Sequence, residues 1–217
     1  MVFEIIPVID IMQGKAVSGV GGRRERYREL KSVYCDSSNP VELVKKLPFR
    51  KVYIADLDAI MHRNPNIRIL ENISKIHKEI WADLGIRDYK DINRYSGLDI
   101  KLVIGTETLQ SIDNICLKEH ILSLDIKDGK LLSPFLPKNP FRAFEFMASM
   151  GARKFIILNI TRVGTLKGCD INIREFIKPN IEIYVGGGIR KKDIERLKKI
   201  GVKGALVGTA LHRGEFT

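Results

Sequence analysis

The chain has 217 residues, 44% of them hydrophobic, which is enough for one well-buried domain and short for two. Lys and Arg outnumber Asp and Glu by 37 to 26, which gives a formal net charge of +11 at pH 7. No apolar run approaches the roughly 18 residues that span a bilayer, and a strand pattern begins at once without a basic leader. We therefore expect a soluble, cytoplasmic protein that forms a single domain over residues 1–217.

The positive charge does not predict a nucleic-acid-binding protein. Basic residues are spread along the chain and alternate with Glu, and no basic patch carries the aromatic side chains that stack on bases. Three cysteines and four histidines lack the spacing of a metal site or a disulfide framework: Cys35, Cys116, Cys169, His62, His77, His120 and His212. Only two Gln, with abundant Lys, Ile and Glu, indicate a thermophile-like composition. We expect no metal and no nucleic-acid partner.

Short β-branched runs alternate with amphipathic helical stretches from end to end, which is typical of parallel βα units. Eight strands are predicted, at residues 4–10, 51–56, 79–83, 101–104, 121–125, 154–159, 181–185 and 204–207. Seven helices are predicted, at residues 40–47, 67–78, 90–95, 111–117, 139–150, 171–176 and 191–199. An eighth helix has room for about one turn before Thr217. A second copy of the chain or a partner subunit is expected to cover that flank.

The chain also repeats itself. At an offset of 103 residues, Gly85-Ile86-Arg87 matches Gly188-Ile189-Arg190 and Gly105-Thr106 matches Gly208-Thr209. At an offset of 115 residues, Asp10 matches Asp125, so the first half holds about twelve extra residues, within positions 18–38. Eight strands with this repeat favour a closed (β/α)8 TIM barrel over an open sheet. The half-barrels are expected at about residues 1–118 and 119–217.

A strand that ends in Gly186, Gly187 and Gly188 predicts a phosphate site. Glycines bring bare backbone N–H groups close to an anion, and Gly208 and Thr209 follow the next strand, as in barrel enzymes that hold phosphate after strands seven and eight. The first half repeats this pattern, so its equivalent residues are also predicted to bind the phosphorylated substrate: Gly85, Arg87, Gly105 and Thr106.

Polar residues end several of the predicted strands, at the barrel face where chemistry occurs. Asp10 and Asp125 end strands one and five, which face each other across the mouth, so they are predicted to be the catalytic pair, one a general acid and the other a general base. Asp56 and Asn159 are predicted to bind substrate, with loop ordering as the alternative. Residues 21–31 are rich in arginine and predict a lid whose Arg23 and Arg24 bind an anion, with a mobile solvated loop as the alternative.

Residues 6–17 (IPVIDIMQGKAV) resemble the opening of the HisA/HisF family of histidine biosynthesis, and residues 52–59 (VYIADLDA) are closer to its isomerase branch than to its cyclase branch. The similarity extends over nearly the whole chain, including residues 164–168 and 206–211. The resemblance implies a barrel without a cofactor that converts a phosphorylated aminoaldose into an aminoketose by an Amadori rearrangement. It also implies Asp10 and Asp125 as the base and the acid, and two phosphate sites for a bisphosphate.

The chain departs from that family pattern at several positions. Leu158 stands where the isomerases usually have Thr, Val163 replaces an acidic residue, and residues 82–85 (ADLG) replace a glycine-rich turn. Asp83 would repel a phosphate at that turn. We therefore expect a divergent phosphosugar enzyme, an isomerase of a phosphorylated sugar or aminosugar. Two alternatives stay open, a genuine ribotide isomerase of histidine biosynthesis and a non-catalytic protein or subunit that binds a phosphorylated ligand.

Overall fold

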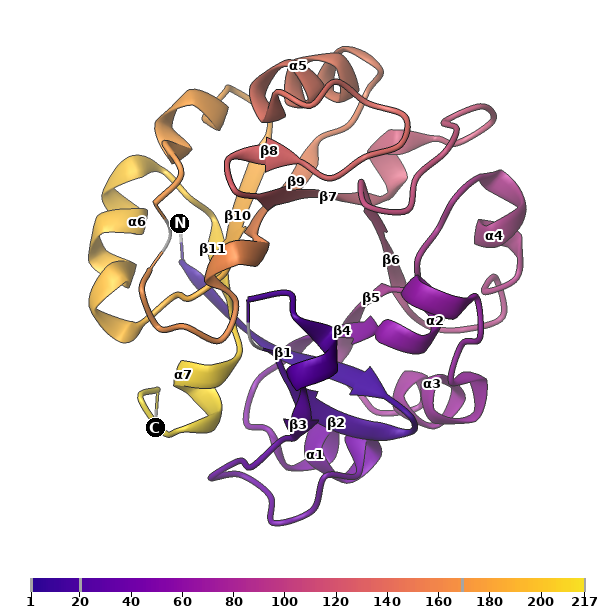
Figure 1. The fold of residues 1–217 in the computed structure, drawn as a ribbon, viewed down its shortest axis with the longest axis vertical. Coiled ribbons are helices and arrows are strands. Elements are labelled where there is room, and N and C mark those ends of the chain that lie inside the picture. The colour runs from indigo at the N-terminus through magenta and orange to yellow at the C-terminus, as the bar shows by residue number, and fades with distance from the viewer. Residues whose placement is uncertain (1, 20, 169, 217) are drawn as a thin grey trace.

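The computed structural model describes residues 2–19, 21–168 and 170–216. Eight parallel strands close into a barrel in the order β1, β4, β5, β6, β7, β9, β10, β11 and back to β1. Their bounds are β1 Glu4–Met12, β4 Lys51–Asp56, β5 Glu79–Asp83, β6 Lys101–Gly105, β7 Ile121–Lys127, β9 Lys154–Asn159, β10 Glu182–Gly186 and β11 Gly204–Val207. Figure 1 looks down this ring and shows the helices outside it. The predicted TIM barrel and all eight of its strands are confirmed.

Seven α-helices cover the outside of the barrel within the described residues. They are α1 Pro40–Lys46, α2 Leu57–His62, α3 Ile67–Ser74, α4 Tyr89–Asn93, α5 Pro140–Ser149, α6 Ile194–Ile200 and α7 Thr209–His212. Short elements complete the fold: β2 Lys15–Ser18, β3 Arg28–Glu29, β8 Lys130–Leu131, and the 3-10 turns η1 Arg24–Arg26, η2 Leu117–Glu119, η3 Ile160–Arg162, η4 Ile173–Phe176 and η5 Lys191–Asp193. The Asn39 and Asn139 side chains cap α1 and α5 ahead of their prolines, as local pattern predicts.

Two predicted helices are wrong. Residues 111–117 form turns, because Ser111 and Asp113 bond to each other and Asn114 takes a left-handed conformation with φ 62°. Residues 171–176 form only the 3-10 turn η4, and Pro179 opposes any helical extension beyond it. Conversely, α2 was not predicted, and it begins directly after β4.

The backbone repeats in two halves. β1 and β7 each continue into an antiparallel hairpin, with β2 and β8 respectively. The two hairpin turns have matching left-handed backbones, with φ of 52° and 76° at Gln13 and Gly14 and of 50° and 74° at Asp128 and Gly129. β4, β5 and β6 recur as β9, β10 and β11 at the offset of 103 residues. The half-barrel repeat inferred from the sequence is therefore a repeat of structure.

α7 is a single helical turn, as predicted for the helix after the last strand. His212 anchors this turn, because its Nε2 lies 2.9 Å from the Val8 carbonyl and its Nδ1 lies 2.9 Å from Ser32 Oγ. Covering of this flank by a second copy or a partner stays a prediction. Among the residues described, no helix is long and apolar enough to cross a membrane. Cys35 and Cys116 are free, and Cys169 lies outside the described residues.

Candidate functional site

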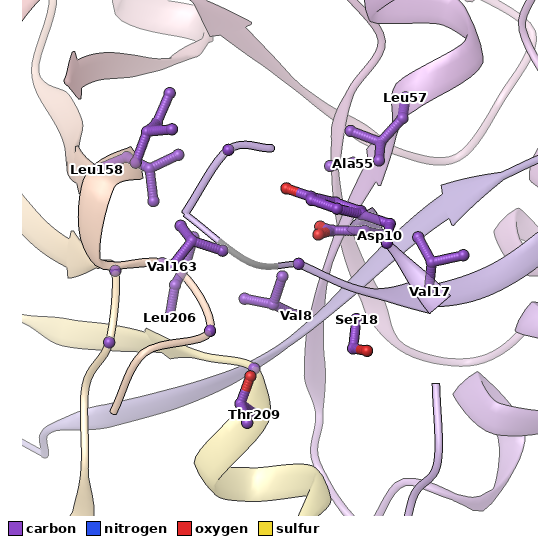
Figure 2. A pocket seen from close by; sticks show the side chains of 18 of the residues that line it. Val8, Asp10, Val17, Ser18, Ala55, Leu57, Leu158, Val163, Leu206 and Thr209 are labelled. Atoms are coloured by element: carbon purple, nitrogen blue, oxygen red, sulfur yellow. The ribbon is translucent and has the colours of Figure 1, made fainter. Parts of the chain in front are cut away.

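The carboxyl ends of the strands surround a cavity of ≈ 200 Å³ at the barrel mouth. Seven of the residues predicted from the sequence line it: Asp10, Arg24, Asp125, Gly187, Gly188, Gly208 and Thr209. Figure 2 shows Leu158, Val163 and Leu206 grouped on one side of the cavity and Asp10 on the other. One cavity therefore joins the two predicted catalytic carboxylates, the predicted phosphate turn and an apolar wall.

Asp10 lies near the end of β1, where the hairpin with β2 begins. A Cβ atom on Gly19 would lie 3.2 Å from Asp10 Oδ2 and 3.0 Å from the Tyr27 hydroxyl, so glycine lets the loop pass close to both groups. Burial raises the pKa of Asp10 to about 7, and the positive charge of Arg24 opposes that rise. Asp10 forms no ion pair with any described residue. Its carboxyl group can therefore exchange a proton near neutral pH.

Asp125 lies in β7 and is 3% exposed. Its carboxyl group accepts hydrogen bonds from Ser123 Oγ at 2.7 Å and from the Glu107 backbone N–H at 3.0 Å. Burial raises the pKa of Asp125 well above its usual range, and the negative charge of Asp83 raises it further. Asp125 is thus the group in this cavity that is suited to keep and donate a proton at neutral pH.

Asp83, at the end of β5, is a third carboxyl group that lines the cavity. It is 7% exposed and accepts hydrogen bonds from the Gly85 backbone N–H at 3.0 Å and from the Tyr53 hydroxyl. A Cβ atom on Gly105 would lie 2.9 Å from Asp83 Oδ2 and 3.0 Å from Asp125 Oδ2, so Gly105 lets the two carboxyl groups approach. Burial raises the pKa of Asp83 as well. The position of Asp83 at the end of a predicted strand is the feature of the sequence that indicates a place in the cavity.

The glycine turn after β10 is shaped by close packing. Gly187 has φ 100°, and a Cβ atom there would lie 2.2 Å from the Asn159 carbonyl oxygen. Gly188 has φ 72°, and a Cβ atom there would lie 2.8 Å from the Arg162 carbonyl oxygen. In the described ranges no acceptor bonds the backbone N–H groups of Gly187, Gly188 or Gly208. Three N–H groups around the cavity therefore remain available to an anion.

Five other predicted phosphate residues do not line this cavity: Gly85, Arg87, Gly105, Thr106 and Gly186. The Arg87 guanidinium group donates to the carbonyl oxygens of Gly85 at 2.6 Å and Ile60 at 3.1 Å. Thr106 is buried, and its Oγ1 accepts from the Asp125 backbone N–H at 3.0 Å. These side chains stabilise the first half of the barrel, and the structure does not direct them to a ligand.

Asp56 and Asn159 also lie outside the cavity. Asp56 caps α2, because its carboxylate accepts from the Ala59 N–H at 3.1 Å and from the Asn66 N–H at 2.7 Å. Asn159 faces a second cleft beside η3, where its amide bonds to Asp170 at 2.5 Å. For both residues the structure matches the alternative interpretation, the ordering of loops.

The arginine-rich loop lies over the barrel mouth (Figure 1). Arg24 forms an ion pair with Glu107 at 2.7 Å, and the Gly21 N–H donates to the Val163 carbonyl at 2.7 Å. The loop therefore connects the ends of β6 and β9, one from each half of the barrel. Arg24 lines the cavity, whereas Arg23 is exposed and does not. Over the described ranges, no group of His, Cys, Asp or Glu side chains could hold a metal ion.

Comparison with solved structures supports the architecture. The 3-hexulose-6-phosphate synthase of Salmonella typhimurium superposes with a TM-score of 0.59 at 14% identity, covering 98% of this chain and 92% of that chain. Thiamine phosphate pyrophosphorylase of Pyrococcus furiosus superposes with a TM-score of 0.53 at 15% identity, covering 98% and 92%. At such identities the likeness is one of fold.

Comparison of sequences is more specific. An uncharacterized protein of Methanocaldococcus jannaschii is 36% identical over 221 residues, covering 97% of this chain and 94% of the relative. The 1-(5-phosphoribosyl)-5-((5-phosphoribosylamino)methylideneamino)imidazole-4-carboxamide isomerase of Thermococcus kodakarensis is 30% identical over 224 residues, covering 97% and 92%. The family profile described as "Histidine biosynthesis protein" matches residues 4–217. Because this profile spans nearly the whole chain, the chain belongs to the histidine biosynthesis protein family, the HisA/HisF family that its sequence resembles.

Proposed function

We propose that this chain is a divergent phosphosugar isomerase that acts on a phosphorylated sugar or aminosugar. The observation that carries the proposal is the pairing of Asp10 and Asp125 around one cavity. They come from equivalent strands of the two halves, they have no basic partner among the described residues, and their pKa values are raised towards neutrality. Two carboxyl groups of this kind can serve as base and acid at the same pH.

The reaction that suits this pair is the conversion of an aldose, or its amino derivative, into the corresponding ketose. Asp125 donates a proton to the ring oxygen, which opens the sugar, and Asp10 removes the proton from C2. Protonated Asp10 then delivers a proton to C1 of the resulting enediol or enaminol, the C2 hydroxyl becomes the carbonyl of the ketose or aminoketose, and the proton of that hydroxyl returns to Asp125. The substrate phosphate is held by the N–H groups of Gly187, Gly188 and Gly208 across the cavity, with the Thr209 hydroxyl beside them.

The apolar wall and the loop separate this reaction from water. Leu158 and Val163 line the cavity at positions where the family resemblance implies polar groups, so the reacting carbons would lie against hydrocarbon. Arg24 places one positive charge at the cavity edge, where it attracts an anionic substrate.

The proposal is tested by following exchange of the substrate proton with solvent, because this measurement does not require the product to be known. Aldose phosphates and their N-substituted amines are incubated with the protein in D2O, and NMR spectroscopy follows deuterium at C1 of the ketose product and at C2 of the remaining substrate. Exchange that the Asp10→Asn variant loses supports the proposal. Retained binding of sugar phosphates without exchange by the unmodified protein would favour the alternative of a non-catalytic binding protein.

A second candidate function is the ribotide isomerase of histidine biosynthesis, favoured by the 30% identity to the Thermococcus kodakarensis protein along 97% of the chain. Asp83, Leu158 and Val163 argue against it, because each alters a position at which the resemblance implies substrate contact. The gene is expressed in a histidine auxotroph that lacks the isomerase. We expect no growth without histidine from a soluble, folded protein, and robust growth would establish the second function instead.

A further inference from the structure

We infer that Asp83 and Asp125 occupy the anion site of the first half-barrel, so that the ligand of this chain carries one phosphate, held by the second half. This inference rests on the proposed function and names its substrate class. It makes Asp83 a residue that determines specificity, although it takes no part in the proton transfer itself.

The internal repeat supplies the first argument, because each backbone N–H of one turn has an equivalent in the other. At the offset of 103 residues, Gly85 corresponds to Gly188 and Glu107 corresponds to Ala210. Gly188 and Ala210 line the cavity, and the Gly188 N–H has no acceptor among the described residues. In the first half, the two equivalent backbone N–H groups donate to carboxyl oxygens of the chain itself. The Gly85 N–H donates to Asp83 at 3.0 Å, and the Glu107 N–H donates to Asp125 at 3.0 Å.

Side-chain volume supplies the second argument. By the same offset, Asp83 stands where the second half has Gly186, and Leu84 stands where it has Gly187. Leu84 is 2% exposed and packs in the hydrophobic core. A phosphate can approach a glycine backbone closely, but in the first turn the Asp83 side chain lines the cavity at the position of Gly186. The first turn therefore carries an acidic side chain at the cavity where the second half has none.

The nearby cations supply the third argument. Arg87 is the basic residue of the first turn, and both of its guanidinium bonds go to backbone carbonyls. Arg24 lies close enough to lower the pKa of Asp83, but its ion pair is with Glu107. A phosphate at this turn would meet the carboxyl groups of Asp83 and Glu107, and the positive charge of Arg24 is already paired with Glu107. The second half presents no carboxylate among its cavity-lining residues after β9.

The inference is tested with two ligands that differ by one phosphate, fructose 6-phosphate and fructose 1,6-bisphosphate, using isothermal titration calorimetry. For the unmodified protein we expect the second phosphate to leave affinity unchanged within a few-fold, whereas a second anion site would improve it at least about tenfold. Asp83→Gly restores the residue of the second half, and it should bind the bisphosphate about tenfold more tightly while its affinity for the monophosphate stays within twofold.

Asp83→Asn is the matched control, because it keeps the size of the side chain and an oxygen for the Gly85 N–H but removes the charge. Asp83→Asn should improve bisphosphate binding less than Asp83→Gly. Circular dichroism is used to check that both variants fold. Tighter binding of the bisphosphate than of the monophosphate by the unmodified protein, or no gain in either variant, overturns the inference. If neither ligand binds, both this inference and the proposed phosphate site are overturned. Failure of the proposed proton transfer is measured separately, by deuterium exchange.

Discussion

Trp81 and Tyr184 pack edge to face inside the barrel, with ring centroids 4.8 Å apart and ring planes at 82°. They lie 103 positions apart, so each half contributes one aromatic ring at the same place in the repeat. Trp81 Nε1 donates to Glu79 at 2.8 Å, and the Tyr184 hydroxyl donates to Glu4 at 3.5 Å. Both rings are fully buried, so the interior is filled two residues before the strand ends that bear the cavity.

Replacement of Trp81 by Ala should lower the free energy of unfolding by about 3–5 kcal/mol, because it leaves a cavity against the Tyr184 ring. Urea denaturation followed by far-ultraviolet circular dichroism measures this loss. Tyr89→Ala is the control, since Tyr89 is 43% exposed and its replacement should cost well under 1 kcal/mol. Equal costs for the two variants would show that the ring pair does not hold the two halves together.

Gly208→Asp should abolish binding of sugar phosphates, because it adds a negative charge at the proposed phosphate turn. This position suits the test better than Gly188. A Cβ atom on Gly208 meets only Val8 Cβ, at 3.8 Å, whereas one on Gly188 would lie 2.8 Å from a carbonyl oxygen. Gly208→Ala separates the effect of bulk from that of charge and should keep most of the affinity. Thermal-shift titration measures both variants, and undiminished binding by Gly208→Asp would move the phosphate site elsewhere.

The rate of isomerisation should show a bell-shaped dependence on pH. Activity should rise as Asp10 loses its proton near its pKa of about 7, and it should fall at higher pH as Asp125 loses the proton that it must donate. Asp10→Asn and Asp125→Asn should each lower kcat about 10²- to 10⁴-fold with little loss of stability. The dependence of kcat/KM on pH measures the two limbs. A flat profile, or near-normal turnover in either variant, would leave only a structural role for that carboxyl group.

Stability should fall as pH rises from about 4 through 7. The pKa of Asp10 is raised from 3.8 to about 7, so the folded state binds a proton that the unfolded state has released, and this contribution disappears above the folded pKa. Asp83 and Asp125 are shifted in the same direction and add to the effect. Melting temperatures at pH 5 and pH 8 measure it. Asp10→Asn should reduce the difference between them, and an unchanged difference would contradict the raised pKa of Asp10.

Breaking the ion pair between Arg24 and Glu107 should loosen the loop over the mouth. The two side chains are 26% and 30% exposed, so the pair contributes little to global stability but fixes the loop. Arg24→Ala should speed proteolysis within residues 19–26 and raise KM with a weaker dependence on salt, since the variant also loses a cation beside the substrate. Arg23→Ala is the control on the same loop, because Arg23 is exposed and does not line the cavity. If Arg24→Ala and Arg23→Ala had equal effects, the positive charge of the loop would influence substrate binding without a specific contact between Arg24 and Glu107.

Much of the fold could be read from local patterns. Apolar runs of about five residues, each followed by Asp, Asn or Gly, identified all eight strands, because buried parallel strands need continuous hydrophobic side chains. The repeated Gly-Ile-Arg and Gly-Thr spacings identified the two halves, because both halves need the same turns after the same strands.

The functions of individual polar residues could not be read in this way, because their partners come from distant segments. Arg87 resembles Arg190 in sequence, yet its guanidinium group bonds a carbonyl at Ile60, 27 positions away. Asp83 could be identified as a strand-end carboxylate, but its approach to Asp125 depends on Gly105 in the intervening strand. Hydrogen bonds and pKa shifts change when the distance between two groups changes by a few tenths of an ångström, and pKa shifts also depend on burial and on neighbouring charge. Only the closure of the barrel brings those distances about.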